Sequence, residues 1–169
     1  MRAHVEPIIA STIRFLARCT DIQKGPKTRR TAYLYDPNAK ESDLQDDLID
    51  WYRGNEHGNP YIESQDVGGG RVEIVFPLSG DRFVVELKRE QADASKESLK
   101  DYLNQVAAYQ ATSICIGMLV VLDLATQGLP AHLRDNVWVE QVPPPIPGGT
   151  SRFVLVVRIP GNRTSPSRL

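Results

Sequence analysis

The sequence predicts an α/β fold with a mixed β-sheet and helices on both of its faces. Residues 68–88 read as a β-hairpin, because apolar and polar residues alternate on both sides of a turn at residues 77–81. Residues 114–122 form a nearly continuous apolar run, typical of a central strand that is covered on both faces. A helical segment separates these two strands. We therefore expect them to be parallel, which makes the sheet mixed.

The remaining elements follow from periodicity and turn residues. Apolar residues at helical spacing predict helices over residues 5–19 and 41–53, and a third helix from Ser95 to about residue 112. Either Asn38 or Ser42 is expected to cap the second helix, and Ser42 with Gln45 matches a capping box. Alternation and β-branched residues predict further strands, which are residues 32–35, 61–67, 137–142 and 153–159.

The length of 169 residues is that of one domain with a closed core. We expect a single domain over residues 1–160. Within it, residues 1–35 form a helical, basic N-terminal extension and residues 36–160 form the core. Residues 161–169 are expected to be a flexible basic tail.

The composition is that of a soluble protein, with 41% hydrophobic and 24% charged residues. No apolar run approaches the roughly 20 residues of a membrane span, so we expect no membrane association. The N-terminus lacks the pattern of a signal peptide. Cys19 and Cys115 lie far apart in apolar surroundings, which predicts reduced core thiols and a cytoplasmic location.

The net charge of −1 hides an uneven distribution of charge along the chain. Residues 1–35 carry seven Lys or Arg against two acids, residues 36–70 two against nine, and residues 141–169 four against none. An acidic middle with basic ends suits a metal site with phosphate-binding edges, although such runs are more often solvated faces. For the basic loop at residues 24–30 we favour a solvated linker over contact with a phosphate backbone.

The strongest chemical signal lies on the second strand of the hairpin. Residues two apart on a strand share a face, so Glu86 and Lys88 should point the same way, with Leu87 opposite them in the core. A surface ion pair on a strand would be an ordinary finding. The context adds weight, because Glu73 lies on the partner strand and a helix carrying Gln105 and Tyr109 follows.

This arrangement resembles the PD-(D/E)xK nuclease superfamily. In that family an acid on an early helix precedes an Asp on the second core strand, then an acid-x-Lys motif on the third strand, and often a Gln-xxx-Tyr helix. The matching positions here are Glu86-Leu87-Lys88 and the pair Gln105 and Tyr109, while Glu73 stands where the family has Asp. The resemblance implies a restriction-endonuclease-like fold.

For the acid of the early helix, the resemblance points to Glu41, which shares a face with the apolar stripe of its helix. Asp46, Asp47 and Asp50 are alternatives on the same helix. The ordinary interpretation is that all four decorate the exposed or N-terminal part of a helix.

The resemblance implies a metal-dependent nuclease that hydrolyses phosphodiester bonds, with DNA favoured over RNA. Glu73, Glu86 and the carbonyl of Leu87 would bind Mg²⁺ or Mn²⁺, Lys88 would position the attacking water, and Glu41 would hold a metal-bound water or a second ion. Gln105 and Tyr109 would help to place the substrate or the lysine. A role in restriction, defence or repair would follow.

Two other classes of protein remain open. One is a catalytically inactive nuclease-like domain that acts as a nucleic-acid-binding or protein-assembly module, and the replacement of Asp by Glu73 favours it. The other is a plain interaction domain. A homodimer is expected if both strands of a duplex are cut, because one chain offers one site. Since no recognition module is present, specificity would have to come from structure in the nucleic acid, from a partner protein, or from a fused or neighbouring protein.

Overall fold

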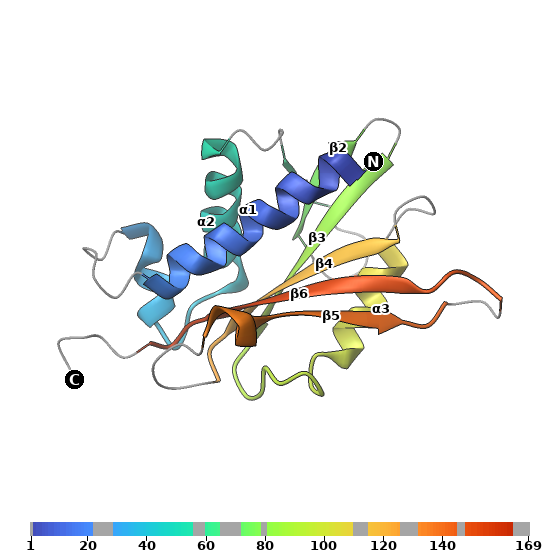
Figure 1. The fold of residues 1–169 in the computed structure, drawn as a ribbon. Helices are drawn as coiled ribbons and strands as arrows, with labels where there is room; N and C mark the ends of the chain where they lie inside the picture. Colours follow the sequence, from blue (N-terminus) through green and yellow to red (C-terminus); the bar gives the residue numbers. More distant parts are fainter. Residues whose placement is uncertain are drawn as a thin grey trace.

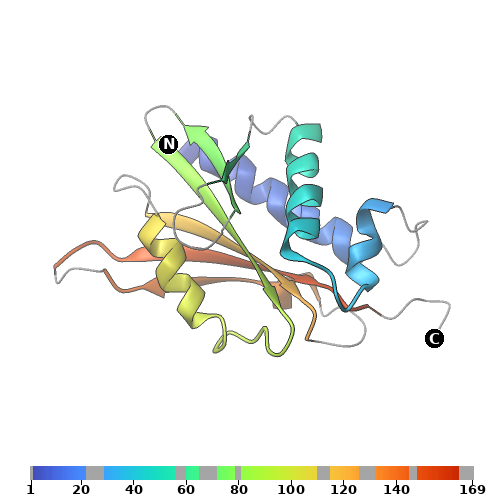
Figure 2. The same cartoon turned by 180° about the vertical axis from the view of Figure 1, so that it is seen from behind.

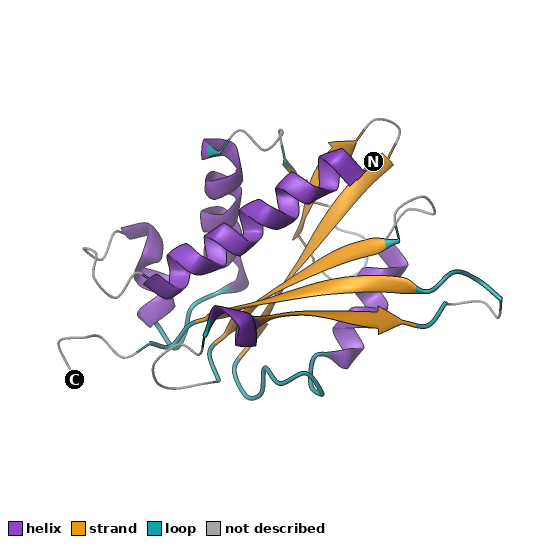
Figure 3. Ribbon diagram, in the orientation of Figure 1, coloured by secondary structure: helices purple, strands orange, loops and turns teal. Residues whose placement is uncertain are grey.

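A computed structural model describes residues 2–21, 29–55, 60–64, 72–78, 81–109, 115–125, 132–144 and 148–163. In this part of the chain, three α-helices and two short 3-10 helices surround a six-stranded sheet (Figures 1 and 3). The elements in chain order are α1 (Arg2–Asp21), η2 (Arg29–Tyr35), α2 (Glu41–Gly54), β1 (Tyr61–Ser64), β2 (Val72–Leu78), β3 (Asp81–Glu90), α3 (Lys100–Tyr109), β4 (Ile116–Asp123), η3 (Leu133–Asn136), β5 (Val137–Val142) and β6 (Arg152–Pro160).

The sheet is mixed, with the strand order β1-β2-β3-β4-β6-β5. Strands β1, β2 and β3 form an antiparallel meander, and the expected hairpin pairs Ile74 with Val85 and Phe76 with Phe83. Strand β4 lies parallel to β3 after the crossover through α3, as the sequence predicts, and β6 lies parallel to β4. Strand β5 returns antiparallel to β6 at the edge.

Strand β4 is covered on both faces, as its apolar run predicts. Met118, Val120 and Leu122 belong to one hydrophobic core, and Leu119 and Val121 belong to another. The first residue of β4, Ile116, is half-buried, and every later residue of the strand is buried. Alternate side chains of one strand therefore connect the two layers of the molecule.

Helices cover both faces of the sheet. Helices α1 and α2, with η2, supply the core on one face, and α3 supplies the core on the other. In Figure 1 α1 crosses in front of the sheet and α3 lies behind it, and Figure 2 brings α3 to the front. The expected class, an α/β protein with a mixed sheet and helices on both faces, is confirmed.

Helix α1 forms part of the core. Phe15, Leu16 and Cys19 are fully buried in it, so the basic N-terminal segment is integrated with the sheet and is not an appendage. None of the helices in the described residues is both long and apolar enough to cross a membrane.

Three local predictions were wrong. Residues 32–35 lie in η2 and not in a strand, and Tyr33 and Leu34 are both buried there. At the start of α2, neither Asn38 nor Ser42 is the cap; the carboxylate of Asp43 accepts the N–H of Lys40 at 2.7 Å. Helix α3 begins at Lys100, five residues after Ser95, because residues 96–99 form turns before the regular helix.

The expected tail and the expected thiols also need correction. Arg163, the last described residue, is buried and donates from its guanidinium to the carbonyl oxygens of Cys19 and Thr20. The chain after β6 is thus tied to the C-terminal end of α1. Both cysteines are free, as predicted, but Cys115 is exposed and only Cys19 is a core thiol. Residues 164–169 lie outside the described residues.

Candidate functional site

Strand β3 places the Glu86-Leu87-Lys88 motif in the interior of the sheet, between β2 and β4. Leu87 packs into the core on the side of α1 and α2, as predicted. Glu86 and Lys88 lie on the opposite face, next to Leu119 and Val121 in the register with β4. The alternation of a regular strand is sufficient to bring these two charges together.

The two charged side chains form a buried ion pair. The Lys88 ammonium donates to Oε1 of Glu86 and also to the carbonyl oxygen of Leu87, at 2.9 Å. Glu86 is 1% exposed and Lys88 is 3% exposed. The sequence suggested a pair on a solvated face. The actual pair has been removed from water, where each charge depends on the other for stabilisation.

Helix α3 covers this pair with a residue that the sequence analysis did not single out. The Lys88 ammonium lies 5.5 Å from the centre of the Tyr102 ring, within the range of a cation–π interaction. The Tyr102 hydroxyl donates to Oε1 of Glu90 at 2.5 Å. Two signals point to these residues: Glu90 is two positions after Lys88 on the same face, and Tyr102 precedes Gln105 by three positions on its helix.

Gln105 and Tyr109 lie on α3, as predicted, and Tyr109 is its last residue. Gln105 is half-buried, and its neighbour Val106 packs in the core beneath the helix. The side chain of Tyr109 lies outside the described residues. Positions 102, 105 and 109 fall on one stripe of a helix, so the predicted motif continues the stripe that meets Lys88.

Glu73 lies on β2, the strand next to β3, where its backbone pairs with that of Glu63 on β1. The β2–β3 ladder runs from Leu78 paired with Asp81 to Ile74 paired with Val85. The next step of this register would bring position 73 opposite Glu86. The side chain of Glu73 lies outside the described residues, so its part in the site stays a prediction.

Glu41 is the first residue of α2, as expected of an acid on the early helix. The buried residues of α2, including Leu44 and Leu48, pack in the core on the face that Leu87 joins. The helix that carries Glu41 and the helix that covers Glu86 therefore lie on opposite faces of the sheet. Glu41 and Glu86 are therefore not covered by the same helix.

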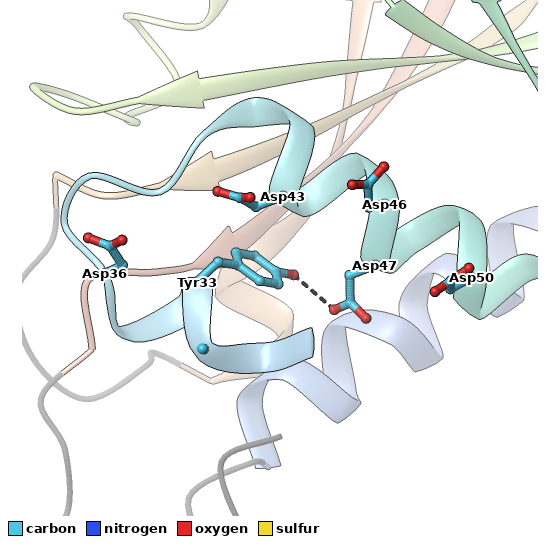
Figure 4. Close-up of a pocket in the computed structure, with 7 residues that line it drawn as sticks. Tyr33, Asp36, Asp43, Asp46, Asp47 and Asp50 are labelled. Atoms are coloured by element: carbon cyan, nitrogen blue, oxygen red, sulfur yellow. Dashed lines mark hydrogen bonds between the residues drawn. The ribbon is translucent and has the colours of Figure 1, made fainter. Parts of the chain in front are cut away.

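The alternatives to Glu41 line a separate acidic pocket of about 640 Å³ (Figure 4). Asp46, Asp47 and Asp50 face the pocket from α2. Asp43 of α2 and Asp36, which precedes the helix, also line it, and neither was predicted to belong to a site. The i, i+3 and i+4 spacing of the four aspartates in α2 was a signal for this shared face.

Within this pocket Asp47 has a structural part. It is buried, it forms an ion pair with Arg18 of α1, and it accepts a hydrogen bond from the Tyr33 hydroxyl at 3.1 Å. Burial, first of all, raises the pKa of Tyr33 well above its ordinary value, and the nearby thiol of Cys19 and carboxylate of Asp47 raise it further. Asp47 thus joins α2, η2 and α1.

The carboxyl ends of β3 and β4 bring two more acids to the face that α3 covers. Glu90 and Asp123 are partners in the parallel register. Asp123 is buried, accepts the N–H of Ala125 at 3.0 Å, and lies 3.9 Å from Nε of Arg158 on β6. Asp123 therefore ends β4 beside a cation.

The oxygens around Lys88 fit a cation. Among the described side chains, no group of three or more His, Cys, Asp or Glu is arranged to hold a metal ion. The Glu86 carboxylate and the Leu87 carbonyl nevertheless converge on a single positive charge, the Lys88 ammonium. Both are hard oxygen ligands of the type that Mg²⁺ prefers. With Glu73 from β2 they would supply the ligand set that the resemblance implies.

Comparison of the chain with protein-family models, with curated proteins and with solved structures finds no match.

Proposed function

We propose that this protein is a metal-dependent nuclease whose catalytic centre is the Glu86–Lys88 pair of β3. The observation that carries the proposal is the burial of this pair in the middle of the sheet. Replacing a buried ion pair by apolar residues is often neutral or stabilising, so such a pair contributes little to stability. A charged pair at a position where apolar residues would serve stability equally well suits a chemical role.

The order of the elements supports the same proposal. From α2 onward the chain runs helix, three antiparallel strands, helix and parallel strand. The PD-(D/E)xK resemblance implies this order, with the acid-x-Lys motif on the third strand and the Gln-xxx-Tyr motif on the helix after it. Glu86, Lys88, Gln105 and Tyr109 all lie on the elements that it requires. We therefore propose a restriction-endonuclease-like core.

The residues would divide the work as follows. Glu86, the Leu87 carbonyl and Glu73 would hold Mg²⁺ or Mn²⁺, which supplies an activated water and neutralises charge on the phosphate. Lys88 would orient the attacking water and offset negative charge. Gln105 would position the substrate from α3, together with Tyr109. Glu41 begins a helix on the other face, so we assign it no part in this centre.

The charges of the two faces favour approach of nucleic acid on the side of α3. The α2 side presents the acidic pocket, whose aspartates repel a phosphate backbone. On the α3 side, Lys96 is exposed beside the ring of Trp138, at 5.2 Å, where it can contact a phosphate. By resemblance, DNA is the preferred substrate, cut by a homodimer or with a partner that supplies specificity.

One observation favours a second candidate function, that of a catalytically inactive nuclease-like module for nucleic-acid binding or protein assembly. The ammonium of Lys88 contacts both oxygens that would bind the metal, and the pair is shielded from solvent as it stands. An inactive descendant of a nuclease would keep such a pair only as a structural element. The difference between the two functions is whether metal and substrate can reach Glu86.

Cleavage assays decide between them. Plasmid, linear duplex, single-stranded DNA and RNA are incubated with Mg²⁺ or Mn²⁺ and the wild-type protein, the Lys88→Ala variant, or the Lys40→Ala variant. Lys40 is exposed at the start of α2 and is the matched control. We expect metal-dependent cleavage by wild type and Lys40→Ala, and none by a folded Lys88→Ala. Equal cleavage by Lys88→Ala would refute the catalytic role, and no cleavage by wild type would favour the inactive module.

A further inference from the structure

Lys88 lies between two acids on one face of β3. Glu86 precedes it by two positions and Glu90 follows it by two, so all three residues share the face under α3. The ammonium turns toward Glu86, where it also meets the carbonyl of Leu87. On the other side, the ring of Tyr102 is 5.5 Å away, and its hydroxyl is bound to Glu90.

The contacts of the ammonium matter because they are those of the proposed metal. The ammonium already occupies the Glu86 carboxylate oxygen and the Leu87 carbonyl, and its positive charge repels a divalent ion at such short range. A buried carboxylate is costly without a counter-charge, so a metal ion that displaced the ammonium would take over the stabilisation of Glu86. The ammonium therefore competes with the metal for these oxygens.

We propose that Lys88 is a two-position cation that guards the metal site. In the first position, the one observed, it neutralises Glu86 and closes the site. In the second it turns toward Glu90 while it stays beside the Tyr102 ring, which leaves Glu86 and the Leu87 carbonyl open to a divalent ion. This inference rests on the proposed function, because it assumes that these oxygens bind metal.

The second position is chemically suitable for an ammonium. Glu90 offers a carboxylate on the same face. It is half-buried, so it keeps more of its hydration than the buried Glu86. The Tyr102 ring lies near enough to stabilise the cation during the exchange. The hydrogen bond from the Tyr102 hydroxyl holds the Glu90 carboxylate in place. A flexible four-carbon side chain can turn between acids at i−2 and i+2 without movement of the strand.

Mn²⁺ affinity, measured by loss of the electron paramagnetic resonance signal of free Mn²⁺, tests this directly. Lys88→Met removes the competing charge, and we expect it to tighten Mn²⁺ binding by about tenfold or more, while the exposed control Lys100→Met leaves it unchanged. Glu86→Gln measures the Mn²⁺ that is held elsewhere, including in the acidic pocket. Unchanged or weaker binding by folded Lys88→Met, above that background, would overturn the inference.

A double-mutant cycle tests the second position. Glu90→Gln removes the destination of the ammonium, so it should weaken Mn²⁺ binding by about threefold in wild type and have no effect in the Lys88→Met background. An equal loss in both backgrounds would make Glu90 a metal ligand and refute the two-position role of Lys88.

If Lys88→Met does not fold, Tyr102→Leu replaces it. Tyr102→Leu removes both the ring and the hydroxyl that holds the Glu90 carboxylate, so it should weaken Mn²⁺ binding, and Tyr102→Phe, which keeps the ring, should weaken it less. Equal affinities of Tyr102→Leu, Tyr102→Phe and wild type would count against the proposal. Affinity and cleavage are separate readouts: the expected Mn²⁺ pattern without cleavage refutes the nuclease alone, and cleavage without that pattern refutes the exchange alone.

Discussion

The buried ion pair makes a quantitative prediction about stability. Lys88→Met removes the ammonium and leaves the Glu86 carboxylate with a side chain only 1% exposed. Breaking a buried pair in this way costs about 3–5 kcal/mol of unfolding free energy, because the remaining carboxylate stays buried and loses the ammonium that compensates its charge. Glu86→Gln should cost less than this, since the neutral amide can still accept a hydrogen bond, while it leaves the ammonium buried.

The double variant Glu86→Gln, Lys88→Met is the informative one. It contains no buried charge at the pair and nearly conserves both volumes, so we expect it to recover most of the loss. The coupling energy of the cycle should be about 3 kcal/mol, at the high end for residues in contact. Such recovery would separate the energetic role of the pair from its chemical role.

Urea denaturation in metal-free buffer with a chelator measures these differences. A loss of about 4 kcal/mol lowers the midpoint by about 2 M urea for a typical slope of about 2 kcal/mol per M. Lys100→Met is the matched control on α3, and as an exposed substitution it should change stability by less than about 0.5 kcal/mol. If Lys88→Met costs no more than Lys100→Met, the pair is solvated and the reasoning is wrong.

Three further predictions concern other parts of the fold. Arg163→Ala should lower the unfolding free energy by about 1–3 kcal/mol in urea denaturation, because it removes charged hydrogen bonds to the end of α1; an unaffected midpoint would contradict this. Asp47→Asn should destabilise by about 2 kcal/mol through the lost ion pair, whereas its exposed pocket neighbour Asp46→Asn should not, and equal thermal midpoints would count against the assignment. Burial raises the pKa of Cys19 from 9.0 to about 12, so its stabilising contribution is complete below pH 9 and is lost toward pH 12. Cys19→Ala should therefore reduce the fall in unfolding free energy between pH 9 and 10.5 by up to about 1.4 kcal/mol per pH unit, and an unchanged slope would argue against it.

The sheet was predictable because its signals are local. Alternation around residues 72–88 fixes the hairpin, and the apolar run of β4 reports a strand with two covered faces. The prediction of a strand at residues 32–35 was wrong because so short an apolar segment has no definite period. Tyr33 lies in a 3-10 helix, where it is buried and its hydroxyl bonds to Asp47, fourteen residues later, and no local pattern reports such a contact.

The sequence predicted which residues of the candidate site share a face of the sheet, but not that they are buried. Residue spacing places Glu86 and Lys88 on one face, but their burial depends on the packing of α3, the crossover helix between β3 and β4, over that face. The contact of Tyr102 with Lys88 and the bonds of Arg163 to α1 have the same origin in tertiary packing. The sequence likewise could not show that Cys115, next to a buried strand, is exposed.

The most direct test of the proposed catalytic centre is the rate of metal-dependent plasmid cleavage by the Glu86→Gln, Lys88→Met double variant beside the wild type. This variant should fold, since it replaces the pair with neutral residues of similar size. The predicted result is a stable protein that has lost cleavage with both Mg²⁺ and Mn²⁺. Cleavage at the wild-type rate by this variant would contradict the assignment of the centre to Glu86 and Lys88.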